Sequence, residues 1–257
     1  MSTFHPLTVS EITKETPTAV SILFEVPEHL NTNYTFKAGQ YLTLKTSIQG
    51  EDVRRAYSIC SATSSKELRV AVKAVEKGLF STYANRSLKK GDVLDVMPPE
   101  GKFSITINSQ HKKNYCAFAA GSGITPILSM LTSVLENEPH STFTLTYGNK
   151  SPEETIFFAQ LNQLKEKFKG RFNLIYIFSQ VHSDAALFGR IDDSIVNFIV
   201  KNKYKHLAFD AYYLCGPEKM IDTASNTLKI NGTSENAIHY ELFTSSASSE
   251  NLSLIHI

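Results

Sequence analysis

A glycine-rich turn in the second half of the sequence has the residue types that bind a pyrophosphate. A strand-like run at residues 115–119 leads into Gly121 and Gly123, and a helical pattern follows. Glycines let backbone N–H groups approach a ligand closely, and the first turn of a helix carries partial positive charge. Thr125 is expected to cap this helix and Pro126 to take its first position. The alternative is a plain strand-to-helix turn that binds nothing.

A second turn of this kind contains Cys215, Gly216 and Pro217, where another strand-like run ends and a helix begins. In an open α/β sheet, ligands bind outside the carboxyl ends of the strands. We therefore expect this turn beside the reactive end of a nucleotide whose phosphates rest on residues 121–125. A tight connection with a buried thiol is the simpler interpretation of this turn alone.

In the first half, residues 54–60 form a strand-like run with two side chains suited to a large cofactor. Alternation places Arg55, Tyr57 and Ile59 on one face and Ser58 on the other. A guanidinium binds phosphate oxygens through paired hydrogen bonds, and a tyrosine ring stacks on a flat π-system. The pattern favours a ligand with a diphosphate and an aromatic ring. An exposed arginine beside an edge tyrosine is the alternative.

Two further segments could contribute to a binding site. A strand ends before Gly78 and a short helix begins near Ser81, which predicts a second anion site. The last strand-like run, residues 238–243, places Glu241 and Phe243 on one face. That face is either an edge-strand pattern or the side wall of a pocket that holds a ring.

Two regions with different patterns must position these residues. The first half contains short β-prone runs separated by polar turns, with one helical stretch at residues 81–88. The runs are residues 19–26, 40–48, 53–60 and 68–75. Many short strands with polar turns predict an antiparallel β-barrel or a sandwich of about 100 residues.

After the polar segment at residues 108–114, strand-like and helical runs alternate. The strand-like runs are residues 115–119, 142–147, 172–178 and 211–215. This alternation predicts βαβ units around a parallel sheet, and therefore a three-layer α/β domain. We expect domains at residues 1–108 and 114–243. Residues 244–257 are expected to be a linker and the truncated start of a missing domain, or an artefact at the chain end.

Composition excludes several classes of protein. The 257 residues are 42% hydrophobic and 20% charged, which predicts globular domains rather than disorder. A net charge of +1 gives no sign of a nucleic-acid or membrane partner. No apolar run approaches the roughly 20 residues of a spanning helix, and no signal peptide is present, so we expect a cytoplasmic protein. The three cysteines are too far apart to predict a metal or cluster site.

In content and in order, these motifs resemble the ferredoxin–NADP reductase superfamily, and more closely its reductase components of bacterial phenylacetyl-CoA epoxidases. The resemblance covers residues 4 to about 243. The segments that carry it are residues 4–7, 39–42, 54–60, 78–81, 91–92, 97–101, 121–126, 189–191 and 215–217. It implies an FAD-binding β-barrel followed by an NAD(P)-binding α/β domain.

The resemblance also implies roles for individual residues. Tyr57, Ser58, Cys215 and Glu241 would be the residues at the reacting rings. The FAD site would contain Arg55 on the diphosphate, Tyr57 on the isoalloxazine, and Ser58, Ile59, Val72, Lys73, Ala74, Gly78, Leu79, Phe80, Ser81 and Phe243. The nicotinamide nucleotide would be held by Gly121, Gly123, Thr125, Pro126, Lys150, Cys215, Gly216 and Pro217. No metal ligand is expected.

The activity implied by the resemblance is transfer of hydride from NAD(P)H onto FAD and release of single electrons. These would go to a [2Fe–2S] centre that serves an oxygenase, here a phenylacetyl-CoA epoxidase. Because the four cysteines for that centre are absent, it is expected in a missing domain or a partner such as a ferredoxin. Residues 147–151 supply Lys150 and no acid, which favours NADPH, although NADH is possible. The alternatives are a stand-alone ferredoxin or flavin reductase and a nucleotide-binding interaction subunit without catalysis.

Overall fold

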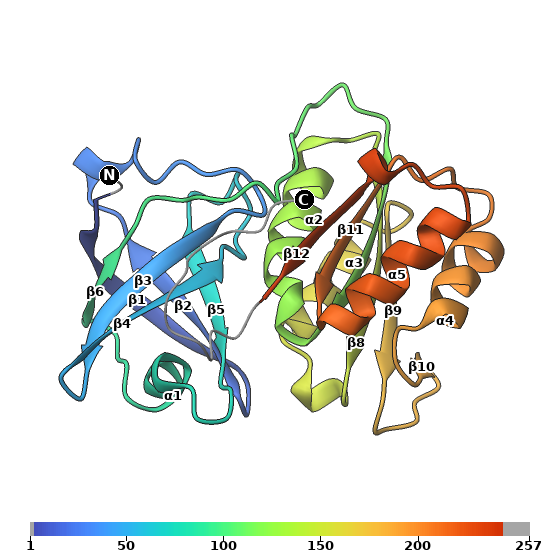
Figure 1. Ribbon diagram of the computed structural model, residues 1–257. Coiled ribbons are helices and arrows are strands. Elements are labelled where there is room, and N and C mark those ends of the chain that lie inside the picture. The colour runs from blue at the N-terminus through green and yellow to red at the C-terminus, as the bar shows by residue number, and fades with distance from the viewer. Residues whose placement is uncertain (1–2, 244–257) are drawn as a thin grey trace.

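The computed structural model describes residues 3–243, so the predicted linker and further domain at 244–257 lie outside it. The chain forms two six-stranded sheets that lie side by side, with α2 between them (Figure 1). The last strand of the first sheet ends at Val96 and the first strand of the second begins at Asn114. The boundary expected at 108–114 lies between them and stays a prediction.

The first sheet is antiparallel, with strand order β4-β3-β6-β1-β2-β5. Its strands are β1 (His5–Thr16), β2 (Ala19–Glu25), β3 (Tyr41–Ile48), β4 (Glu51–Ser58), β5 (Leu68–Lys73) and β6 (Val93–Val96). A bridge between Ile59 and Val70 joins the end of the β4 run to β5 and brings the two outer strands together. The predicted barrel is therefore confirmed, with helix α1 (Leu79–Arg86) and the 3-10 turn η1 (Glu28–Leu30) in its connections.

The second sheet is parallel throughout, with strand order β10-β9-β8-β7-β11-β12. Its strands are β7 (Asn114–Ala120), β8 (Thr142–Asn149), β9 (Phe172–Phe178), β10 (Ala186–Phe188), β11 (Ala211–Gly216) and β12 (Ile238–Leu242). The helices are α2 (Ile124–Asn137), α3 (Phe158–Lys167), α4 (Asp193–Asn197) and α5 (Glu218–Ile230). Shorter turns are η2 (Gly121–Gly123), η3 (Pro152–Glu154), the π-helical η4 (Phe198–Lys203) and η5 (Glu235–Ala237).

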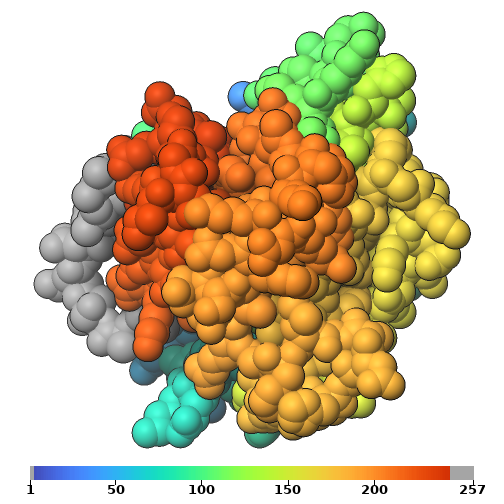
Figure 2. Space-filling view, turned by 90° about the vertical axis from the view of Figure 1, so that its right-hand side faces the viewer, coloured from blue at the N-terminus to red at the C-terminus, as the bar shows by residue number. Residues whose placement is uncertain are grey.

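Helices cover both faces of this sheet, which confirms the predicted three-layer domain. One core contains α2 and α3 with Leu145 and Tyr147, and the other contains residues of α4 and α5 with Phe118 and Leu214. The outer layer, with α5 and the segment around α4, occupies the face seen in Figure 2. Among the described residues, no helix is long and apolar enough to cross a membrane.

Helix α2 packs on two sides at once, and every residue from 124 to 135 is buried. Its side chains share a core with the sheet and also with Ala38, Cys60 and Phe103 of the barrel side. An added Cβ on Gly39 would lie 2.3 Å from Met130 Cε, so the chain passes directly against the helix. The two domains are therefore joined through α2.

Several element ends differ from the predictions. The helix expected at residues 81–88 begins earlier, at Leu79, and the helical segment from Asp193 to Lys203 divides into α4 and the π-helical η4. Phe157 precedes α3 with a left-handed backbone, φ 61°. The short strands β6 and β10 were not predicted, because four and three residues are too few to show a period.

Candidate functional site

The two domains meet at a hydrogen bond between residues that the sequence assigns to the same site. Ser58 Oγ, at the end of β4, donates to Glu241 Oε2 on β12 over 3.3 Å. Ser58 is 3% exposed, and burial raises the pKa of Glu241 to about 7, against the lowering effect of the Ser58 hydroxyl. The Glu241 carboxyl therefore changes charge close to neutral pH at the junction of the domains.

Cys215 lies next to Glu241 in the parallel register of β11 and β12. Its thiol is fully buried, and burial together with the Glu241 charge raises the pKa of Cys215 well above its usual value. The cysteine is therefore a neutral thiol rather than a thiolate nucleophile. Phe243, directly after β12, is 44% exposed at the same end of the strand.

On the barrel side, Tyr57 lies beside the residues of α1. Its ring centroid is 5.3 Å from that of Phe80, and burial raises the pKa of the Tyr57 phenol. Arg55, two residues earlier on β4, is exposed, and its guanidinium donates a hydrogen bond to the carbonyl of Arg54. The remaining donors of that guanidinium face solvent, where an anionic ligand can reach them.

The second anion site predicted from the sequence lies in the β5–α1 connection. Gly78 is the N-cap of α1, and an added Cβ there would meet Ser81 Oγ and Val75 within 2.5 Å. The Ser81 hydroxyl donates to Gly78 O and accepts from Val75 N, so the side chain shapes the turn itself. Leu79 is 41% exposed and Ala74 is partly buried. A ligand at this turn would meet backbone N–H groups of the helix start.

Three residues expected at the FAD site point into the barrel core. The side chains of Ile59, Val72 and Phe80 are at most 1% exposed. Contacts of Ile59 and Val72 to a cofactor would therefore come from their backbone, and the Val72 carbonyl already accepts from Asn85 Nδ2. Asn85 was missed from the sequence, because an asparagine inside a helical pattern carries no distinct signal.

The glycine-rich turn occupies the carboxyl end of β7. Gly121 has a positive φ of 55°, and its carbonyl accepts a hydrogen bond from the buried Tyr147 hydroxyl at 2.8 Å. The expectation for the helix start was wrong. Gly123 is the N-cap of α2, Thr125 donates to the Ser122 carbonyl instead of capping, and Pro126 is the third helical residue. Pro126 still lies in the first turn, where no N–H is needed.

Gly123 lies so close to the backbone of Cys215 that no side chain would fit at position 123. An added Cβ on Gly123 would lie 2.1 Å from the Cys215 carbonyl oxygen. The end of β11 therefore lies directly against the start of α2. At Gly216, an added Cβ would be crowded by Met220 and Ala120. Pro217 is the N-cap of α5. The two predicted nucleotide turns are neighbours, as expected.

The β8–α3 connection carries Lys150, which is exposed at the same sheet edge. The backbone N–H of Gln180 donates to the Lys150 carbonyl, and Asn149 Nδ2 is buried without a hydrogen-bond acceptor. Four residues later, Glu154 lies 3.8 Å from Lys73 Nζ and accepts from the Thr18 hydroxyl. The side chain of Lys73, expected at the FAD site, thus pairs with the other domain. Nothing in the sequence around either residue indicates this pairing.

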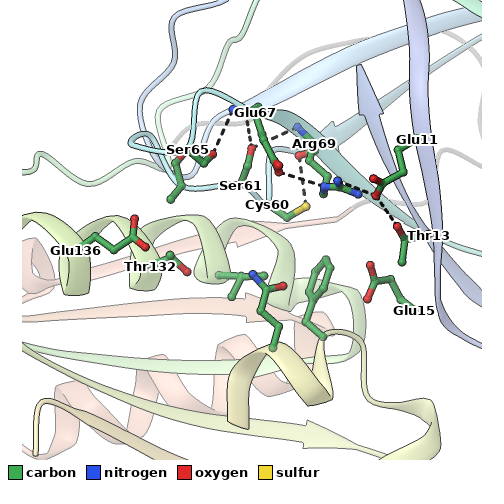
Figure 3. Close-up of a pocket in the computed structure, with 14 residues that line it drawn as sticks. Glu11, Thr13, Glu15, Cys60, Ser61, Ser65, Glu67, Arg69, Thr132 and Glu136 are labelled. Carbon is green, nitrogen blue, oxygen red and sulfur yellow. Dashed lines mark hydrogen bonds and ion pairs between the residues drawn. The ribbon is translucent and has the colours of Figure 1, made fainter. Parts of the chain in front are cut away.

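A cavity of about 400 Å³ lies elsewhere between the domains. Figure 3 shows it between the barrel side, with Arg69 and Ser61, and helix α2, with Thr132 and Glu136. None of the predicted cofactor-binding residues lines it. Among residues 3–243, no group of three or more His, Cys, Asp or Glu side chains could hold a metal ion.

The predicted residues fit a dinucleotide and a flavin on three observations. The Arg55 guanidinium is exposed to solvent, and the buried Asn149 amide donor has no acceptor among the described residues. Within residues 3–243, no atom lies within 4 Å of a Cβ added to Gly121, so these residues leave the backbone just before α2 open to a ligand. Each feature suits a phosphate or ribose oxygen.

Comparison with protein families agrees with this division into two binding sites. Residues 6–105 match the oxidoreductase FAD-binding domain, and residues 118–226 match the oxidoreductase NAD-binding domain. The chain is 43% identical over 244 residues to one of the subunits of 1,2-phenylacetyl-CoA epoxidase from Escherichia coli (strain K12), covering 95% of this chain and 68% of that protein. It is 29% identical to the ferredoxin reductase component of 3-ketosteroid-9-alpha-monooxygenase from Rhodococcus rhodochrous, covering 93% of this chain and 65% of that protein.

Solved structures show the same fold at low identity. The flavohem-like FAD/NAD binding domain of nitric oxide dioxygenase from Vibrio cholerae superposes with a TM-score of 0.78 at 23% identity, over 94% of this chain and 99% of that one. A ferredoxin NADP+ reductase from Neisseria gonorrhoeae, with bound FAD and NADP, gives 0.76 at 22% identity, with the same coverage of both chains. With the sequence match over nearly the whole chain, these findings establish that the chain belongs to the ferredoxin reductase family of FAD-dependent NAD(P)H oxidoreductases.

Proposed function

We propose that this chain takes hydride from NADPH with the help of bound FAD and delivers single electrons to an iron–sulfur centre that serves an oxygenase, specifically a phenylacetyl-CoA epoxidase. The observation that best supports the cofactor chemistry is the Ser58–Glu241 hydrogen bond, which joins β4, where we propose that the flavin binds, to β12 of the parallel sheet. The epoxidase assignment is supported by the 43% identity to the epoxidase component of Escherichia coli. That chain is longer, so its partners are carried over as part of the proposal.

The residues of this chain would bind and orient two cofactors. Arg55 would neutralise the FAD diphosphate, and Tyr57 would hold the isoalloxazine ring against β4. The turn at Gly121 and Gly123 would hold the pyrophosphate of the nicotinamide nucleotide at the start of α2. Bound FAD would supply what no side chain can, the acceptance of a hydride and the release of its electrons one at a time.

Ser58 and Glu241 would hold a proton beside the flavin. The Glu241 carboxyl, with its pKa raised to about 7, can hold a proton at neutral pH, and the Ser58 hydroxyl lies in hydrogen-bond contact with it. Cys215, buried next to Glu241, would exclude water from the face that the nicotinamide approaches.

The partner would be an iron–sulfur domain or a separate ferredoxin together with an oxygenase component. Support comes from the oxygenase reductase components among the relatives. We also propose a cytoplasmic location, where NADPH and reduced iron–sulfur proteins are available.

The test is an anaerobic titration of the FAD-reconstituted protein with NADPH and then NADH, followed by addition of a [2Fe–2S] ferredoxin. We expect bleaching of the flavin band, faster with NADPH, and then reduction of the ferredoxin. Reduction of oxygen or free flavin but not of any ferredoxin would favour a stand-alone flavin reductase. A protein that binds nucleotide but no FAD would be a non-catalytic nucleotide-binding subunit, and the proposal would fail.

A further inference from the structure

Two buried serines of α2 form hydrogen bonds with the barrel. Ser129 Oγ donates to the Ser61 carbonyl at 2.7 Å. Ser133 Oγ, one helical turn later, accepts from the Thr63 backbone N–H at 3.0 Å and lies 3.3 Å from the Thr63 hydroxyl. We call these four residues, Ser61, Thr63, Ser129 and Ser133, the α2 clasp. Because Ser129 and Ser133 are spaced by four, they share one helix face.

The helix side of the clasp is shielded from water, whereas Thr63 on the barrel side is partly buried. Ser129 and Ser133 are both 0% exposed. A serine inside a helix usually bonds to the carbonyl four residues earlier, but here each hydroxyl bonds to the other domain. Hydrogen bonds in such a setting are directional and lack competition from solvent. The clasp therefore adds directional contacts to the apolar packing of α2 against Ala38, Cys60 and Phe103 on the barrel side.

The position of the clasp along the chain links the two proposed cofactor sites. Ser61 follows Ser58 by three residues, so the clasp begins just after the end of β4, where we propose that the flavin binds. Ser129 belongs to the helix that starts at Ile124, directly after the nucleotide turn Gly121–Gly123. A small rotation at the clasp would shift the nucleotide turn relative to β4.

A cavity lies beside the clasp, between the barrel side and helices α2 and α3. It separates Arg69 from α2 and α3, and its lining includes Ser61 and Thr132 (Figure 3). At its rim, Ser64 Oγ donates to Glu136 Oε2, a contact between exposed residues. Solvent weakens that rim contact, so the buried clasp is the stronger restraint.

We propose that Ser129 and Ser133 are positioning residues for hydride transfer, because they hold the nicotinamide site at its working distance from the flavin site. This inference rests on the proposed function. In that step the C4–H bond of NADPH would break and the hydrogen would leave with both electrons to N5 of bound FAD, so that NADPH would be oxidised to NADP+ and FAD would be reduced by two electrons. The rate of such a transfer falls steeply when the reacting atoms are misplaced by about 1 Å.

The test compares the FAD-loaded protein with its Ser129→Ala/Ser133→Ala variant in anaerobic single-turnover reduction by NADPH. We expect the limiting rate of flavin reduction to fall by ~10-fold, whereas the NADPH dissociation constant and FAD content stay unchanged. Ser64→Ala is the matched control, because it removes only the exposed contact, and it should keep the wild-type rate. A double variant with the wild-type limiting rate would overturn the inference.

A second measurement separates positioning from stability. The Thr63→Cys/Ser133→Cys variant places a disulfide where the native hydroxyls lie 3.3 Å apart. With the disulfide formed, the limiting rate should stay within about twofold of wild type, and reduction of the disulfide should lower it about 10-fold. Equal slow rates in both states, or a lower melting temperature with a normal rate, would overturn the positioning role. If the unmodified protein is not reduced by NADPH, the proposed function itself fails, and this inference fails with it.

Discussion

The Ser58 hydroxyl and the Glu241 carboxyl lie 3.3 Å apart although 183 residues separate them in the chain. The contact exists only when the barrel and the parallel sheet are packed together, because each domain supplies one partner. Burial of the Glu241 carboxyl in the packed structure raises its pKa to about 7, against the lowering effect of the Ser58 hydroxyl. The titration of Glu241 is therefore a property of the assembled site and not of its own strand.

This pKa predicts a pH dependence of stability. The Glu241 pKa is about 7 in the folded protein and near 4.5 in the unfolded chain. Between these values the folded state binds more protons, so the contribution of Glu241 to stability is complete below about pH 4.5 and falls as pH rises, by about 1.4 kcal/mol per pH unit. Above pH 7 it stays constant. Urea denaturation of wild type and Glu241→Gln between pH 5 and 8 measures the difference.

We expect the Glu241→Gln variant to lose less stability than wild type across this range. Glu235→Gln is the matched control, because Glu235 is an exposed carboxylate whose pKa is lowered by Lys229. It should retain the wild-type slope. Equal slopes for wild type and Glu241→Gln would show that the Glu241 carboxyl titrates as an ordinary exposed group.

Arg55→Ala should weaken FAD binding, because it removes a charge-assisted hydrogen bond to a phosphate. The binding free energy of FAD should weaken by about 1.5–3 kcal/mol, measured by fluorescence titration of the apoprotein with FAD. Arg54→Ala is the natural control. The Arg54 guanidinium lies over the Phe4 ring, 5.3 Å from its centroid, and belongs to the other face of β4. Equal losses in the two variants would mean that only the general charge of the strand matters.

The sequence predicted the barrel, the parallel sheet and the proximity of the two nucleotide turns. Periodicity in the residue types predicted the barrel and the parallel sheet, because burial of one face of a strand or helix places apolar residues at regular intervals. The turn at Cys215 was expected beside the turn at Gly121, because carboxyl ends of parallel strands share an edge. Gly123 and Cys215 are indeed in direct contact.

Contacts across the domain interface could not be predicted in this way. Lys73 and Glu154 belong to different domains, and nothing local in either segment indicates the other. Ser129 and Ser133 interrupt the apolar pattern of α2. A serine that faces solvent would interrupt the pattern in the same way, so the sequence alone does not indicate that these two contact the barrel. The start of α2 was misplaced for a similar reason, since the packing of Gly123 against Cys215, and not the hydroxyl of Thr125, sets it.

Gly123→Ala should damage both stability and nucleotide binding. Its φ of −61° is accessible to alanine, but the new Cβ would lie 2.1 Å from a backbone oxygen of Cys215, so β11 or α2 must shift. We expect a loss of about 3 kcal/mol in the free energy of unfolding and weaker NADPH binding. Chemical denaturation and NADPH titration of the FAD-loaded variant measure the two effects.

Gly121→Ala provides the comparison for Gly123. No atom lies within 4 Å of the added Cβ, and only the positive φ of 55° opposes it. The expected cost is about 1–2 kcal/mol, from backbone strain alone. If Gly121→Ala destabilised the protein as much as Gly123→Ala, close packing against Cys215 would not be the reason for the glycine.

Lys150→Ala should reduce the preference for NADPH over NADH. The exposed ammonium stands at the carboxyl end of β8, where it can pair with the 2′-phosphate that only NADPH carries. Loss of that contact should lower the efficiency of reduction by NADPH about 10-fold or more and leave NADH unchanged, since a charge-assisted contact contributes about 1.5–3 kcal/mol. Stopped-flow reduction of the FAD-loaded variant with each nucleotide measures both efficiencies.

Lys169→Ala controls for the loss of one positive charge, because Lys169 is exposed in the turn between α3 and β9. It should keep the wild-type ratio of the two nucleotides. An equal decrease for NADPH and NADH in Lys150→Ala would place the lysine near the part that both share, the pyrophosphate, rather than near the 2′ position. If the ratio of NADPH to NADH efficiency and both rates stayed unchanged, Lys150 would not belong to the nucleotide site. The choice of nucleotide would then depend on other groups at this sheet edge, and Asn149 and Gln180 would be the next residues to change.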